Sequence, residues 1–210
     1  MHLLDYLQQH LLSRAALLRA ASIDDATLTG LQERGAAPLP SYRLDIDIGC
    51  VSFFGQHCEQ ARQEYYATGC TSWIATVHES KLAPFEIFAD RYRARLGALR
   101  AAGLSSTLAK LNAGLEDHLK DEWVHFLDGT YGLCTRTGLP EDIAAKELAV
   151  TIIHQMLEHA WGRALEAPQR IRLARAVDLL DSASSPFAPH EVERSSRRRL
   201  VDQVRAAYLS

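Results

Sequence analysis

The chain has 210 residues, of which 47% are hydrophobic and 23% are charged, and its formal net charge is −3. This size and composition allow one domain, or one domain with a small appendage, and exclude wholesale disorder. The slightly acidic balance gives no general indication of a polyanion-binding protein. The four cysteines form no CxxC pair, so we expect free thiols in a reducing compartment and a cytoplasmic protein.

The sequence predicts neither a signal peptide nor a membrane partner. The first residues lack a basic region and carry Asp5 early, and no apolar run approaches the roughly 18 residues of a membrane span. Basic residues gather instead in the last quarter of the chain. Residues 163–210 contain nine arginines and six acids. This excess either pairs with the acidic remainder of the chain or forms an anion site at the C-terminal end.

Residues 1–45 are predicted to form a unit of two short helices joined by a tight turn. Ser13 is placed to cap the first helix, Asp24 or Asp25 to cap the second, and Gly35 to end it. Two helices joined in this way are a helix-turn-helix. The stretch resembles the opening of MerR-type regulators at the following positions: Ser13, Leu17, Leu18, Ile23, Leu28, Leu31, Gly35, Pro38, Tyr42 and Arg43.

The charge of this unit argues against the DNA binding that the resemblance implies. Residues 1–45 contain four arginines and five acids, and Arg34 is the basic residue of the second helix. A protein that reads DNA needs basic side chains for the phosphates. Nucleic acid is therefore not an expected partner, and the unit is expected to serve in packing or protein contact.

Residues 46–210 are predicted to form a helical domain, which makes the whole chain all-α with a small helix-turn-helix unit packed beside it. Alternating residues allow at most one short strand near 43–48. Prolines stand at three of the predicted helix starts, where a missing N–H costs little. The predicted helices cover residues 55–67, 84–101, 104–127, 140–165, 168–182 and 190–208.

His118, Glu122 and His125 share one polar stripe at the border of the apolar face of the helix 104–127. Two imidazoles and one carboxylate suit a single transition-metal ion, so this stripe is the predicted metal site. Glu122 and His125 also have the ExxH spacing of carboxylate-bridged helix bundles, but the second ExxH of such bundles is missing. The alternative is a solvated flank whose side chains bond within the helix.

A second polar stripe on the helix 140–165 contains Glu147, Thr151, His154 and Glu158. A stripe opposite an apolar face usually faces water. If it instead faces the stripe that contains His118, a cluster of histidines and carboxylates forms between the two helices. The sequence leaves both arrangements open.

Two stretches resemble a bacterial family described as natural product biosynthesis protein (domain of unknown function 6058). They cover residues 123–147, with the turn from Asp128 to Gly132, and residues 187–197. The resemblance implies an accessory protein or enzyme of natural product biosynthesis that binds a small molecule, without an established reaction. Whether the chain is an enzyme stays open.

We expect the ligand pocket of such a protein to include Tyr131, Arg136 and His154. Arg136 suits a carboxylate, either that of a substrate or that of an internal glutamate. The alternative function is a MerR-like regulator or protein-interaction adaptor whose helical domain senses a ligand or a partner. A homodimer through the C-terminal helices would be compatible with either function.

Overall fold

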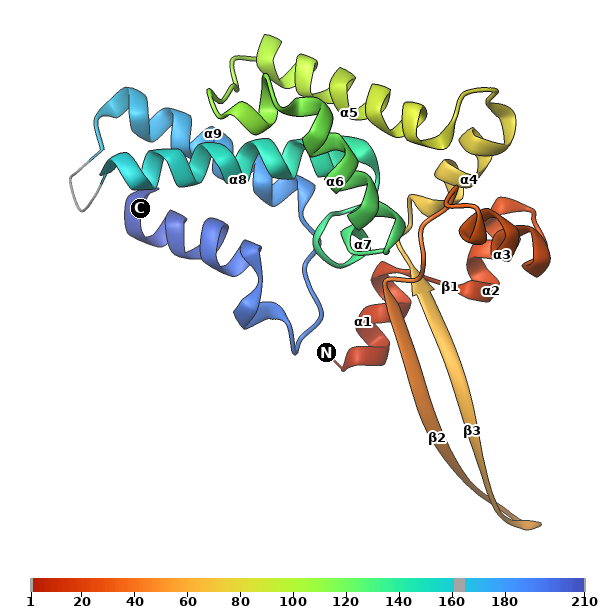
Figure 1. The fold of residues 1–210 in the computed structure, drawn as a ribbon. Coiled ribbons are helices and arrows are strands. Elements are labelled where there is room, and N and C mark those ends of the chain that lie inside the picture. The colour runs from red at the N-terminus through yellow and green to blue at the C-terminus, as the bar shows by residue number, and fades with distance from the viewer. Residues whose placement is uncertain (1, 161–164, 210) are drawn as a thin grey trace.

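Residues 2–160 and 165–209 are described by the structure, a computed structural model (Figure 1). Helices make up most of it, and a small antiparallel sheet lies near the N-terminus. In chain order the elements are α1 (Leu3–His10), β1 (Leu12–Ser13), α2 (Arg14–Ala21), α3 (Asp25–Glu33), β2 (Tyr42–Ser52), β3 (Gly55–Tyr66), α4 (Cys70–Glu79), α5 (Pro84–Ala101), η1 (Ala109–Leu111), α6 (Leu115–Leu127), α7 (Tyr131–Cys134), α8 (Pro140–Ala160), α9 (Ala167–Ala183), η2 (Val192–Arg194), η3 (Arg198–Asp202) and η4 (Arg205–Leu209).

The prediction of an all-α fold with at most one short strand near 43–48 is wrong. β2 and β3 form a long antiparallel hairpin, paired from Tyr42↔Tyr65 to Ser52↔Gly55. β1 pairs with the C-terminal end of β3, which gives a three-stranded sheet in the order β1-β3-β2. The helix predicted over 55–67 is therefore a strand, and Figure 1 shows the hairpin extending away from the helices.

Cross-strand pairing explains why this stretch is a strand. Residues 56–64 are rich in Gln, Glu, Ala and Arg, which favour helices in isolation. In the hairpin, however, Arg62 Nε donates to Asp45 Oδ1 at 3.0 Å, and Gln60 Nε2 donates to Asp47 Oδ1 at 2.9 Å. Gly55, with a φ of 118°, allows the chain to reverse after a two-residue loop. Contacts distant in sequence thus outweigh local propensity.

The two short helices predicted within residues 1–45 are α2 and α3. Ser13 Oγ accepts a hydrogen bond from the Ala16 N–H at 3.3 Å, and Asp24 Oδ1 accepts one from the Thr27 N–H at 2.8 Å. Ser22, with a φ of 54°, makes the tight turn between them. Their interpretation as a helix-turn-helix stays a prediction, as does the domain boundary at 45–46, which falls within β2.

Most of the later helices lie close to their predicted ranges. The helix predicted over 104–127 is shorter, because α6 begins at Leu115. Before it, Ser106 Oγ accepts a hydrogen bond from the Leu108 N–H at 3.1 Å, a local bond that competes with helix formation. The last residues predicted for the helix 140–165 include 161–164, which lie outside the described residues. The segment predicted as a helix over 190–208 is interrupted between η2 and η3.

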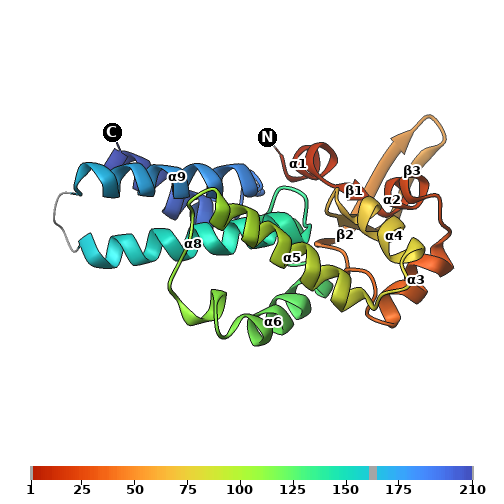
Figure 2. The same ribbon diagram turned by 90° about the horizontal axis from the view of Figure 1, so that it is seen from above.

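The main hydrophobic core joins α2 and α3 to the rest of the chain, and α1 packs in a smaller cluster beside it. Trp73 of α4 packs edge-on against Phe126 of α6, with ring centroids 4.7 Å apart, and its Nε1 donates to the Ala36 carbonyl at 2.8 Å. α8 and α9 lie side by side, and α5 packs on α8 (Figure 2). Among the described residues, no helix has the length and apolar character needed to cross a membrane.

A buried histidine and carboxylate cluster between two helices

α6 and α8 bring together three potential metal ligands, His118, Glu122 and Glu147. One nitrogen or oxygen atom of each lies within 4.8 Å of those of the other two. His118 and Glu122 are one turn apart on α6, and His118 Nδ1 lies 3.6 Å from Glu122 Oε1. Their side chains are only 10% and 8% exposed. The apolar side of α6, which includes Leu119 and Phe126, packs into the core and thereby turns this pair toward the interior.

Two tyrosines bond to the α6 pair. Tyr92 of α5 has its Oη 3.2 Å from His118 Nε2, and Tyr131 of α7 donates its hydroxyl proton to Glu122 Oε2. The contact to Tyr92 uses Nε2 of the imidazole, whereas Nδ1 is the ring nitrogen that lies near Glu122. His118 is thus oriented from one side, with Nδ1 directed toward Glu122.

Two lysines bond to the third ligand. Lys146 Nζ lies 3.3 Å from Glu147 Oε1, and Lys110 Nζ lies 3.1 Å from Oε2. Lys146 also stands over the Tyr131 ring, 5.7 Å from its centroid. The two ammonium groups compensate the charge of Glu147, which a partly buried carboxylate requires.

Burial and neighbouring charges shift the pKa values of the three ligands in different directions. Burial has the largest effect on Glu122 and His118. Burial raises the pKa of Glu122 to about 7, and the neighbouring charge of Glu147 adds to that rise. Burial lowers the pKa of His118 and so favours the neutral imidazole. Burial alone would raise the pKa of Glu147, but Lys146 and Lys110 outweigh it and the pKa is lowered. Near neutral pH, the cluster therefore contains a neutral histidine, an ionised Glu147 and a Glu122 close to half protonation.

A model of a family of unknown function (DUF6058) matches residues 84–209, more than half of the chain. The chain belongs to this family. No curated protein and no solved structure matches it. The DUF6058 region begins at α5 and includes every residue of the cluster and its polar neighbours, whereas the N-terminal helices and the sheet precede it.

All six predicted site residues lie within the DUF6058 region, but only some of them lie at the cluster. His118 and Glu122 belong to the cluster, and Tyr131 is buried beside Glu122. His125 is exposed, with its ring centroid 6.5 Å from that of Tyr131, and it is not part of the three-ligand group. His154 is also exposed.

Arg136 lies apart from the cluster. Its Nε donates to the Ser182 carbonyl at 2.6 Å, at the end of α9. Glu147 was not among the predicted ligands, although the sequence left open that the α8 stripe faces α6. The structure brings the first two positions of that stripe inward, since Glu147 is half-buried and Thr151 is buried.

One imidazole and two carboxylates within reach of one another can hold a single divalent transition-metal ion. The Nδ1 of His118 would be the ligand atom, with Nε2–H donating to Tyr92, because ligating histidines usually donate their other N–H to a fixed acceptor. A carboxyl group with a pKa near 7 can also exchange a proton with a bound molecule at neutral pH.

Proposed function

We propose that this chain binds one transition-metal ion through His118, Glu122 and Glu147. The observation that carries the proposal is the approach of three ligand atoms, from two packed helices of the DUF6058 region, to within 4.8 Å of one another. Exposed acidic groups often lie close together on protein surfaces without binding metal. This group, in contrast, is largely shielded from solvent. It also includes His118, whose lowered pKa favours the neutral imidazole with a free lone pair.

Lys110 bonds to the Glu147 carboxylate and would be displaced by the ion. Its side chain is 42% exposed, so its ammonium can move into solvent and release Glu147 Oε2. Lys146 is 13% exposed and would stay on Glu147 Oε1 as the outer partner of a ligating carboxylate. The two carboxylates would then offset the charge of the ion. Binding also requires Glu122 to lose its proton, so affinity should fall below neutral pH.

Three protein ligands leave coordination positions free for water or a small molecule. We place this centre in an accessory protein or enzyme of bacterial natural product biosynthesis. The resemblance of residues 123–147 and 187–197 supports this context. In such a protein, the metal or Glu122 would act on the bound molecule. Tyr131 adjoins the centre through Glu122 and is the member of the predicted ligand set closest to it.

Metal analysis with three single-residue variants tests the proposal. The protein is purified without chelator, and bound Zn, Fe and Mn are measured by elemental analysis and by titration of the metal-free form. We expect about one ion per chain in the wild type, and at least tenfold weaker binding in His118→Ala and Glu147→Gln. His125→Ala is the matched control, because it removes an exposed histidine from the same helix and should retain the metal.

A further variant examines the role of Lys110. Lys110→Ala should bind metal more tightly than the wild type, because the ion no longer competes with an ammonium group for Glu147. Absence of metal from the wild type after anaerobic loading with Fe²⁺, or equal loss in the His125 and His118 variants, would contradict the proposal.

The N-terminal unit supports a second candidate function. In chain order α2 and α3 precede the β2–β3 hairpin, an order compatible with a helix-turn-helix that carries a β-hairpin wing. The tip of this hairpin presents Phe53 and Phe54, which are 97% and 96% exposed. An exposed aromatic pair on a projecting hairpin suits protein contact, so we infer an adaptor role for this unit.

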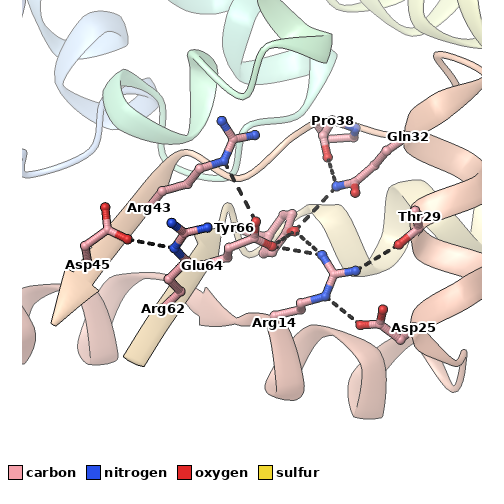
Figure 3. Close-up of polar contacts among 10 residues, drawn as sticks. All are labelled: Arg14, Asp25, Thr29, Gln32, Pro38, Arg43, Asp45, Arg62, Glu64 and Tyr66. Atoms are coloured by element: carbon pink, nitrogen blue, oxygen red, sulfur yellow. Dashed lines mark hydrogen bonds and ion pairs between the residues drawn. The ribbon is translucent and has the colours of Figure 1, made fainter. Parts of the chain in front are cut away.

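Internal contacts of Arg14 reduce the case for DNA binding by the same unit (Figure 3). Its guanidinium donates to Asp25 at 2.6 Å, to Glu64 at 2.8 Å, and to Tyr66 and Thr29, each at 3.0 Å. It is therefore not free to bind phosphates, and its contacts hold α2, α3 and β3 together. Titration with duplex DNA at low salt should give no binding; salt-dependent binding would restore the regulator hypothesis.

A further inference from the structure

One edge of β3 has a strand partner only at its base. The edge that faces β2 is paired from Gly55 to Tyr65, whereas β1 pairs with the opposite edge only at Tyr65 and Tyr66. In the part of the chain that the structure describes, residues 56–64 therefore have no strand partner on the β1 side, and we call this stretch the free edge. It belongs to the hairpin that extends away from the helices (Figure 1). A long exposed edge is a template for pairing with another strand.

The hairpin tip, residues 49–55, is apolar and contains no charged side chain. Val51, Phe53 and Phe54 are 79%, 97% and 96% exposed. The two phenylalanine rings contact each other edge-on, with centroids 5.4 Å apart. Exposed apolar surface of this kind marks a contact site.

A groove of about 1020 Å³ lies at the other end of the free edge. It is lined by residues 62–65 of β3 and by apolar side chains of β1 and α2, including Leu12 and Leu18. The two arginines in its wall, Arg14 and Arg62, are each paired with carboxylates. The groove therefore suits an apolar, uncharged segment, which is the chemistry of the hairpin tip.

We propose that two copies of this chain form a dimer in which their free edges pair antiparallel and each hairpin tip docks in the groove of the other copy. The proposal rests on the protein-contact role inferred above for the hairpin, and it names a second copy as the partner. Tip and groove lie at opposite ends of one edge, so each tip meets the partner's groove when the two strands run in opposite directions. Such a two-fold contact is closed and stops at two chains.

A two-fold axis at Gln60 pairs all of residues 56–64 without placing like charges opposite each other. Gln60 then faces its own copy, and Glu59 faces the partner's Ala61. Arg62 faces the partner's Cys58. An axis at Glu59 would instead place two carboxylates opposite each other, which is destabilising.

The contact area is sufficient for a specific dimer. A phenylalanine side chain buries about 150–250 Å², so Phe53 and Phe54 of two copies supply about 600–1000 Å². The paired edges add to this area, and specific interfaces begin at about 1,200 Å².

Sedimentation equilibrium over a range of protein concentrations tests the dimer. We expect the wild type to dimerise, and the double variant Phe53→Ser/Phe54→Ser to associate at least tenfold more weakly. Gln60→Lys should have a similar effect, because it places two ammonium groups opposite each other. These residues are exposed, so the folded chain should persist, which circular dichroism checks. Ile171→Ser is the matched control, because it replaces an apolar residue of α9 that is 63% exposed, and it should dimerise like the wild type.

Disulfide trapping tests the register. In a Cys50→Ser/Cys58→Ser background, Gln60→Cys should form a linked dimer on mild oxidation, because opposite residues of antiparallel strands lie within disulfide reach. Gln56→Cys should stay unlinked, because the proposed register separates it from its own copy by about 26 Å, at roughly 3.3 Å per residue.

A wild type that is monomeric at every concentration, or a dimer that Ile171→Ser disrupts and the tip variant does not, would overturn the proposal. A monomer whose tip binds a different protein would also overturn it, but would keep the contact role of the hairpin. Metal binding separates this inference from the metal proposal, since the tip variant should retain its metal. Loss of the dimer with metal retained in the tip variant supports both.

Discussion

Glu122 links the protonation of the chain to its stability. Its pKa is about 7 in the folded protein, because burial disfavours the charged form, whereas the ordinary value is 4.5. Below pH 4.5 the carboxyl group is protonated in both the folded and the unfolded state. Between these values the folded state keeps a proton that the unfolded state has released, so the free energy of unfolding falls as pH rises. Above about pH 7 the carboxyl group is ionised in both states, and its effect on the free energy of unfolding no longer changes with pH.

Glu122→Gln should remove this pH dependence. Glutamine keeps an oxygen that can accept from Tyr131, but it never ionises. Relative to the wild type, the variant should gain unfolding free energy between pH 5 and pH 8, up to ~3 kcal/mol at about 1.36 kcal/mol per pKa unit. Urea unfolding of both proteins at pH 5, 6, 7 and 8, with chelator present, measures the gain. A constant difference across this range would show that Glu122 does not ionise within it.

The polar stripe of α6 shows how far the sequence could predict the cluster of His118, Glu122 and Glu147. On a helical wheel, Glu122 lies closest to the apolar side of α6, His118 next and His125 farthest. Their burial follows this order, from 8% exposed at Glu122 to an exposed His125. The periodicity of one helix could therefore predict a half-buried pair. It could not select Glu147, because which face of α8 meets α6 depends on the packing of the whole domain.

At the scale of elements, the turn between α6 and α7 is fixed by a glycine. Gly129 has a φ of 77°, and a Cβ at this position would collide with the carbonyl oxygen of Leu39. The Leu39 N–H donates to the Leu127 carbonyl at 2.7 Å, so this turn packs directly against the segment that leads into β2. The sequence predicted a turn here, from Asp128 to Gly132, but it did not predict the long strand β2 that follows the Leu39 segment.

Two glycine substitutions should therefore act in opposite directions. Gly129→Ala should lower the free energy of unfolding by about 2–4 kcal/mol, because it combines an unfavourable positive φ with a backbone clash. Gly97→Ala, in the middle of α5 with open space around it, should raise it by about 0.5–1 kcal/mol. Chemical denaturation of both variants measures the two effects. A Gly129 variant as stable as the wild type would mean that the turn relaxes freely.

The hairpin is the element that local sequence predicted least well. Its outer half is exposed on both faces, so burial imposes no clear alternation of apolar and polar residues from Ile48 to Gln60. Strand structure there depends on the pairing of β2 with β3. A local sequence pattern does not contain the register of that pairing. By contrast, α5 begins at Pro84 as predicted, because a proline start and an amphipathic repeat are local signals.

At the scale of the whole molecule, the DUF6058 region shares its core with the residues before it. The hydrophobic core contains Leu17 from α2 and Leu28 from α3, Trp73 from α4, and Leu148 and Leu180 from α8 and α9. The family match begins only at residue 84. Because burial of apolar surface is shared across that boundary, neither part can expose its half of the core without cost to the other.

We therefore expect the chain to unfold in one cooperative transition. Far-ultraviolet circular dichroism, which follows the helices, and near-ultraviolet circular dichroism, which follows aromatic packing, should give the same urea midpoint. Trp73→Ala should lower the free energy of unfolding by about 3–5 kcal/mol, because it opens a cavity against Phe126 and leaves the Ala36 carbonyl unpaired. The two signals should still coincide in this variant. Two separate transitions would instead mean that residues 1–83 form an independent unit, whose contact with the DUF6058 region is a docking surface rather than a shared core.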